Sequence, residues 1–193
     1  MFSPKGKDVM FYEVLTQNLI NNKEISVFAC CPISRALQLN VFPGCYIATE
    51  GTLMSKRKEV GNKKIIKTSV FASKFQKLEK NDLEELSYTL NTNVCEVVGR
   101  VAHAPILKQA KNGQKITVFE IAVEKDEAVF DYIPFVAFAN QSKYIIQNAR
   151  VGDKIAVKGH LNDNKVLIGY EYGKQVFERS SMVHVDEAVF LKY

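Results

Sequence analysis

The chain contains an internal repeat, in which each residue of 7–53 aligns without a gap with the residue 108 positions later, in 115–161. The match is densest where SVFACCPISRALQLNVFPGCYIATEGTL, from Ser26, aligns with PFVAFANQSKYIIQNARVGDKIAVKGHL, from Pro134. A repeat at a fixed offset indicates one structural unit used twice. Because the period is about the size of a small domain, it predicts two tandem domains rather than a solenoid.

At 193 residues the chain has room for two small domains. We expect an N-terminal domain over 1–79, a linker over 80–92 and a C-terminal domain over 93–193. A short helix capped by Asp82 and an extension of the first domain are both consistent with the linker sequence. No apolar run has the length of a membrane span, and the N-terminus lacks the apolar core of a secretory signal. These features predict a cytoplasmic protein without a membrane partner.

The second copy has the pattern of a complete small β-barrel. An Asn-Gly turn at 112–113 separates its first two strands, and Gly152 ends a helix that follows the third strand. This order is that of a five-stranded Greek-key barrel of the OB-fold, with a short helix between strands 3 and 4. The predicted strands are 93–106, 115–123, 131–139, 154–161, 165–172 and part of 176–193, with the helix at 141–149.

The first copy follows the same order but begins late. Its predicted strands are 7–16, 25–31, 45–56 and 63–75, with a helix at 33–40. The segment before Lys7 contains Pro4 and Gly6 and is too short for a strand. The sequence therefore predicts an all-β protein of two tandem OB-folds, of which the first lacks strand 1. Such a barrel is open, or it is completed by another segment or by a partner chain. A wrongly assigned start of the first copy is the alternative.

The basic residues are concentrated in the first copy. Between Met54 and Lys80 there are nine Lys or Arg residues and two acidic residues, whereas the whole chain has a net charge of +5. Most of these cations fall on a predicted hairpin, where like charges that face each other repel. An anionic partner such as a phosphate backbone would relieve this repulsion and release counterions. A solvated basic surface is the alternative.

The sequence contains no pattern typical of a metal site or an enzyme. The four cysteines, Cys30, Cys31, Cys45 and Cys95, form no C-x-x-C pair, so we expect buried free thiols and no metal. The three histidines match no nucleophile or metal motif, and no phosphate-binding glycine loop is present. We therefore predict a binding protein without a cofactor.

Four sequence blocks of the second copy resemble the bacterial and phage single-stranded-DNA-binding proteins. They are NVCEVVGRVAHAP, NGQKITVFEIAV, DYIPFVAFA and VGDKIAVKGHL, in the order and spacing of that family. The first copy resembles the same family from Lys7 to about Glu79. The resemblance implies a protein that coats and protects single-stranded DNA with little sequence preference, in replication, recombination or the transfer of mobile elements.

Binding of an unpaired strand requires cations for the phosphates and rings on which the bases stack. Strand alternation places Tyr132, Pro134, Val136 and Phe138 on one face, and the other face carries Ile133, Phe135 and Ala137. The resemblance implies stacking roles for Tyr132 and Phe138, so we assign their face to the nucleic acid and the other to the barrel interior. Burial of both rings in the core is the alternative.

A second group of rings, Tyr170, Tyr172 and Phe177, flanks the expected hairpin tip at Gly173 and Lys174. In OB-folds this loop contacts the ligand, although cross-strand packing would also explain the rings. The predicted nucleic-acid-binding residues are Lys56, Arg57, Lys58, Lys63, Lys64, Lys67, Arg100, Tyr132, Phe138, Lys165, Tyr170, Tyr172 and Lys174.

The chain departs from the family in three ways. It has no Trp, its first copy has Glu24 and Cys30 where the second has Tyr132 and Phe138, and it ends in DEAVFLKY without an acidic recruitment tail. Because the family often presents four OB units, two per chain predict a homodimer. An OB-fold adaptor subunit that docks proteins and an RNA-binding barrel are the alternative functions.

Overall fold

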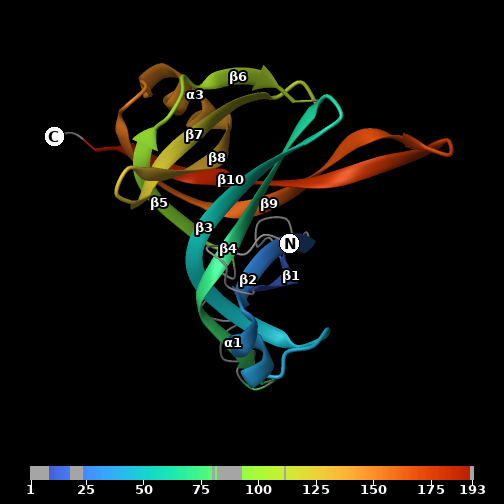
Figure 1. Cartoon of the computed structure of the whole chain (residues 1–193). Helices are drawn as coiled ribbons and strands as arrows, with labels where there is room; N and C mark the ends of the chain where they lie inside the picture. The colour runs from blue at the N-terminus through green and yellow to red at the C-terminus, as the bar shows by residue number, and fades with distance from the viewer. Residues whose placement is uncertain (1–8, 18–23, 80, 82–92, 111, 192–193) are drawn as a thin grey trace. The chain divides into compact units, whose positions relative to one another are not determined.

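The protein is mostly β-structure in the computed structural model, which describes residues 9–17, 24–79, 81, 93–110 and 112–191. This confirms the predicted all-β class, whereas the tandem arrangement of two barrels stays a prediction. The first half contains β1 (Val9–Gln17), β2 (Glu24–Pro32), α1 (Ile33–Gln38), β3 (Tyr46–Val60) and β4 (Lys63–Leu78). The second half contains β5 (Cys95–Val101), β6 (Ile106–Gln109), β7 (Lys115–Asp126), β8 (Val129–Phe138), α3 (Ala139–Asn148), β9 (Lys154–Glu171) and β10 (Lys174–Phe190) (Figure 1).

The chain divides into two compact units that do not coincide with the two copies. One unit is Met1–Leu53 with Ser69–Thr92, and the other is Met54–Thr68 with Asn93–Tyr193. The outer part of the β3–β4 hairpin, residues 54–68, therefore groups with the second copy. The domain limits at 79 and 93 stay a prediction, and residues 80 and 82–92 of the predicted linker lie outside the described residues.

The second copy forms a closed barrel. Its strands are ordered β5-β9-β10-β8-β7-β6, and an additional β5–β7 pairing joins the two sides of the sheet. The strands β8 and β10 are parallel, with Phe135 opposite Val183, while the other neighbours are antiparallel. This is the strand order of the OB-fold, and α3 follows the third barrel strand as predicted.

The barrel interior is filled by one row of side chains from each strand. In β8 the inward row is Ile133, Phe135 and Ala137, each at most 1% exposed, as the alternation predicts. The rings of Phe119 and Phe135 are stacked with their centroids 5.3 Å apart. Burial of such side chains is the main favourable contribution to folding of this unit.

The repeated glycine of the two copies has the same structural role in each. A Cβ atom on Gly159 would lie 2.0 Å from the carbonyl oxygen of His184 on β10. A Cβ atom on Gly51 would lie 2.0 Å from the carbonyl oxygen of Phe71 on β4. Only glycine permits this close approach of neighbouring backbones. The glycine is thus identical in the two copies because each copy needs the same close packing of two neighbouring strands.

The strands of the first copy have the order β1-β2-β4-β3, which matches β7-β8-β10-β9. The strands β2 and β4 are parallel, like β8 and β10. On the edge away from β10, β9 pairs with β5. No described strand pairs with the equivalent edge of β3. As a result Ile47 and Leu53 are only half-buried, whereas their equivalents Ile155 and Leu161 are at most 2% exposed.

Two predicted boundaries in the second copy are wrong. The predicted strand 93–106 ends at Val101 and resumes as β6, because Pro105 between them has no N–H for the ladder. The predicted strands 154–161 and 165–172 form the single long strand β9. The Asp163 and Asn164 positions, expected in a turn, pair with Ser181 and Ser180 of β10 and continue the ladder.

All four cysteines are free, and Cys30, Cys31 and Cys95 are buried as expected, whereas Cys45 is only half-buried. Burial raises the pKa of Cys95 to about 11, so its thiol stays protonated at neutral pH. Among the described residues, no helix combines the length and apolar character needed to cross a membrane.

Candidate nucleic-acid interface

The basic hairpin of the first copy, residues 54–68 of β3 and β4, is attached to β10 of the second copy. The Ser181 hydroxyl accepts a hydrogen bond from the Thr68 N–H at 2.9 Å and donates one to the Thr68 carbonyl at 2.9 Å. The Ser180 hydroxyl donates to the Ile66 carbonyl at 3.0 Å. Both serines and Thr68 are buried. Because these bonds involve the backbone of β4, they fix the hairpin without using its charges.

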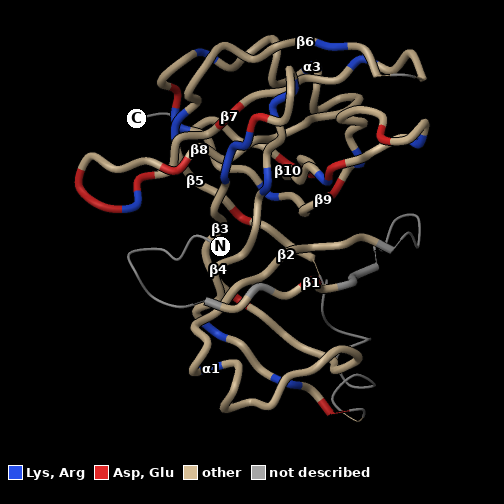
Figure 2. Tube along the Cα trace, turned by 45° about the vertical axis from the view of Figure 1, so that its right-hand side comes forward, with Lys and Arg blue, Asp and Glu red and all other residues tan. Residues whose placement is uncertain are grey.

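Three cations of the basic hairpin are paired with carboxylates of the second copy. The Arg57 guanidinium lies 2.6 Å from Glu120 on β7. Both Lys58 and Lys67 reach Glu178 on β10, at 3.5 and 3.1 Å. We expected the repulsion within the hairpin to require an external anion, but these carboxylates relieve part of it. Figure 2 accordingly shows basic and acidic segments interleaved over the barrel.

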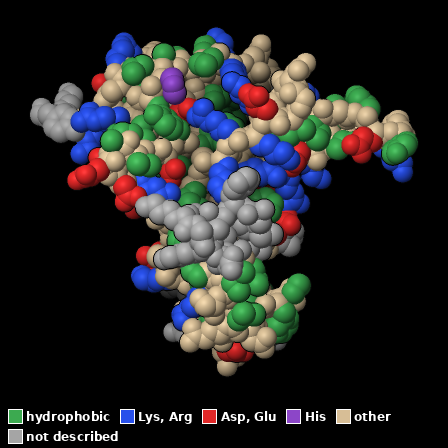
Figure 3. All heavy atoms as spheres, viewed as in Figure 1, with side chains coloured by type: hydrophobic (Ala, Val, Ile, Leu, Met, Phe, Trp, Pro, Cys, Tyr) green, Lys and Arg blue, Asp and Glu red, His purple; other side chains and the backbone are tan. Residues whose placement is uncertain are grey.

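The other hairpin cations are exposed. The Lys63 ammonium donates a hydrogen bond to the Leu167 carbonyl of β9, while the side chains of Lys56 and Lys64 are exposed to solvent. In the space-filling view, Lys and Arg side chains on the visible face are interspersed with acidic ones (Figure 3). The surface is therefore cationic but carries its own anions.

The exposed ring of Tyr132 is connected to Arg57 of the basic hairpin through His103 and Glu120. It is 43% exposed, and the His103 ring lies 6.3 Å from it. The Glu120 carboxylate is shared, since it is 3.4 Å from His103 and 2.6 Å from Arg57. A cation from the first copy and a ring from the second are thus brought together. The sequence did not indicate a role for His103 or Glu120, because their contacts depend on where the hairpin packs on the barrel.

A second cation lies in the same cross-strand row as Tyr132. Tyr132 pairs with Ala122, which pairs with Arg100 on β5. Paired residues share a face of the sheet, so Arg100 lies on the outer face with Tyr132. The Arg100 guanidinium donates to the Gly152 carbonyl at 2.9 Å, which holds it near the end of β5.

The face of β8 that was predicted to contact the ligand is not exposed to solvent along its whole length. Pro134 and Val136, expected to face the ligand, are at most 3% exposed. The Phe138 ring is half-buried and packs on His184, with the centroids 5.0 Å apart. The prediction that all four residues of this face are exposed is therefore wrong. Of the four, Tyr132 is the exposed residue. The stacking role of Phe138 stays a prediction.

The β9–β10 hairpin extends beyond the barrel and carries the second group of rings (Figure 1). Tyr170, Tyr172 and Phe177 are 65%, 102% and 47% exposed. Tyr172 and Gly173 both have positive φ, at 49° and 75°, and form the tip turn, one residue before the expected Gly173 and Lys174, since Lys174 begins β10. No other aromatic ring of the described residues packs on these three, so the hairpin presents them to solvent.

Two lysines of the candidate site lie on this hairpin. Lys165 and Lys174 are exposed, and they are placed opposite Arg179 and Glu171. Within the described parts of the chain, no group of three or more His, Cys, Asp or Glu side chains could hold a metal ion.

Residues 92–181 match the model of the Single-strand binding protein family. Two crystal structures of the single-stranded DNA binding protein from Thermus aquaticus share the fold of this chain. The wild-type structure has a TM-score of 0.69 and 15% identity, covering 100% of this chain and 86% of that one. A deletion mutant has a TM-score of 0.64 and 16% identity, covering 96% and 82%. No curated protein matches the sequence significantly.

Proposed function

Because residues 92–181 match the model of the Single-strand binding protein family, we propose that the chain binds single-stranded DNA and coats it with little sequence preference. The proposed role is protection of unpaired strands in replication, recombination or mobile-element transfer. This is a binding function without catalysis. The four sequence blocks of the second copy favour the same function.

One observation carries the proposal: the family match falls on a closed barrel whose outer face joins an exposed ring to cations. Tyr132 lies near His103, and Arg57 and Arg100 lie on the same side of the barrel. Stacked bases and neutralised phosphates together give affinity that does not depend on sequence. The exposed rings of the β9–β10 hairpin would extend this surface.

A fluorescence-anisotropy titration tests the function directly. Labelled oligo-dT of increasing length is titrated with the protein at low salt, and the shortest length that reaches full affinity gives the site size. Competition between poly-dT and poly-U separates DNA from RNA preference. Undetectable binding of oligo-dT at low salt would contradict the proposal and favour an adaptor that docks proteins.

We further propose that the two copies act as tandem OB units and that a homodimer presents four of them. The first copy supports this by its matching strand order and by the half-buried row of Ile47 and Leu53 on β3. Size-exclusion chromatography with light scattering tests the assembly. A monomer at all concentrations would refute the dimer while leaving the binding function intact.

Substitution of Tyr132 with alanine is expected to weaken binding of oligo-dT by about 1–3 kcal/mol, because a stacked base would lose its ring. The side chain is 43% exposed, so the variant should remain folded. Tyr132→Phe is the matched control, since it keeps the ring and should bind like the wild type. Equal affinity of a folded Tyr132→Ala protein would remove this residue from the site.

A further inference from the structure

The geometry points to a built anion-binding site at Lys58, Lys67 and Glu178, in which the Glu178 carboxylate occupies the place of a phosphate. We propose that a phosphodiester group of the bound strand displaces Glu178 from the two lysines. Glu178 would then act as an internal competitor that limits affinity and salt dependence. This inference rests on the proposed function, because it names a subsite for the same ligand.

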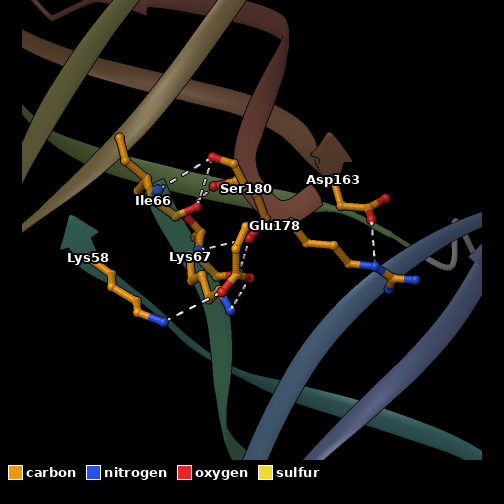
Figure 4. A network of polar contacts seen from close by, with 9 residues as sticks. Lys58, Ile66, Lys67, Asp163, Glu178 and Ser180 are labelled. Atoms are coloured by element: carbon orange, nitrogen blue, oxygen red, sulfur yellow. Dashed lines mark hydrogen bonds and ion pairs between the residues drawn. The ribbon is translucent and has the colours of Figure 1, made fainter. Parts of the chain in front are cut away.

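The contacts around Glu178 have the form of an anion site. Lys58 is 3.5 Å from one carboxylate oxygen and Lys67 is 3.1 Å from the other, so each oxygen has its own ammonium group (Figure 4). The lysines come from facing strands of the first copy, and the carboxylate comes from β10. A phosphodiester likewise offers two anionic oxygens to a pair of cations.

The electrostatic state of Glu178 agrees with this arrangement. The hydrogen bond from Lys67 is the main reason that the pKa of Glu178 lies below its ordinary value, and Lys58 contributes. The carboxylate is therefore ionised at neutral pH and competes with any other anion. All three side chains remain partly exposed, at 63%, 43% and 25% for Lys58, Lys67 and Glu178. A phosphate from solvent can reach them, and exposed ion pairs are weak enough to exchange.

Glu178 is not needed to hold the hairpin in place. The backbone of β4 is fixed by Ser180 and Ser181 through hydrogen bonds at Ile66 and Thr68. These bonds are buried and remain when the charge of Glu178 is removed. The two lysines would therefore stay close together in a Glu178→Gln protein, with one fewer negative charge beside them.

The test compares Glu178→Gln with the wild type in binding of labelled oligo-dT across a range of salt. The loss of one competing charge should steepen the slope of log K against log salt by about 0.7. At low salt this corresponds to about fivefold to tenfold tighter binding. Glu127→Gln is the matched control, because this exposed carboxylate in the β7–β8 turn has the same charge change and should leave the slope unchanged.

A double-mutant comparison links the effect to the lysines. In a Lys58→Gln/Lys67→Gln background, Glu178→Gln should no longer tighten binding. The lysine variant alone should flatten the slope, which gives an independent readout if Glu178→Gln does not fold. Unchanged or weaker binding by a folded Glu178→Gln protein would overturn the subsite, as would an unchanged slope in the lysine variant. Failure of the wild type to bind oligo-dT would instead overturn the proposed function.

Discussion

Replacement of Gly159 with valine is expected to lower the free energy of unfolding of the second barrel by about 3 kcal/mol, near the upper end for overpacked sites. The first side-chain atom would lie 2.0 Å from the His184 carbonyl oxygen, closer than any real contact. The obstacle is backbone and cannot rotate away, so β9 and β10 must separate. These strands are central to barrel closure, because β9 also pairs with β5.

Denaturant unfolding followed by far-UV circular dichroism measures this effect. The matched control is Gly169→Ala on the same strand, where a Cβ atom meets nothing within 4 Å. That change should alter stability by less than about 1 kcal/mol, toward stabilisation, since alanine loses less conformational entropy than glycine. If the two variants unfold at the same denaturant concentration, close packing at Gly159 does not limit stability.

The local features of the fold could be predicted because short-range rules fix them. The inward row of β8 follows from strand alternation, and the turn at Gly173 follows from the need for positive φ. The repeat added long-range information, because it transferred the strand order of the second copy to the first. The missing first strand of the first copy stays a prediction.

The seating of the basic hairpin could not be predicted from the sequence. Its anchors, Ser180 and Ser181, carry small hydroxyls that have no pattern of their own, and they lie more than a hundred residues from Ile66 and Thr68. Likewise, nothing in the sequence pairs Glu178 with Lys67. Such contacts form only once the hairpin and β10 have packed against each other. The sequence therefore indicated the positive charge of the hairpin but not the carboxylates that neutralise part of it.

The same limit applies to Phe138. Alternation correctly places it on the outer face of β8, but exposure depends on what else covers that face. His184, on the parallel neighbour β10, packs against the ring. Tyr132 lies nearer the start of the same strand, and its ring remains exposed. Period-two patterns therefore identify the side of a strand but not which of its residues a neighbour covers.

Replacement of Lys56, Arg57, Lys63 and Lys64 with alanine is expected to have the largest effect on binding. If each cation neutralises one phosphate, the slope of log K against log salt should fall by about 3. Extrapolated to low salt, this is a loss of about a thousandfold in affinity for oligo-dT. The loss should shrink as salt rises, because counterion release then contributes less.

The position of the cations, rather than their number, is what this experiment must test. The control removes four exposed lysines outside the predicted site: Lys108, Lys115, Lys143 and Lys158. Both variants carry the same net charge, so an effect of total charge would lower both slopes equally. A reduced slope in the hairpin variant alone would show that this part of the first copy contacts the strand. Since the hairpin is fixed to β10 by serine hydroxyls, loss of its charges should leave the barrel folded, which circular dichroism verifies.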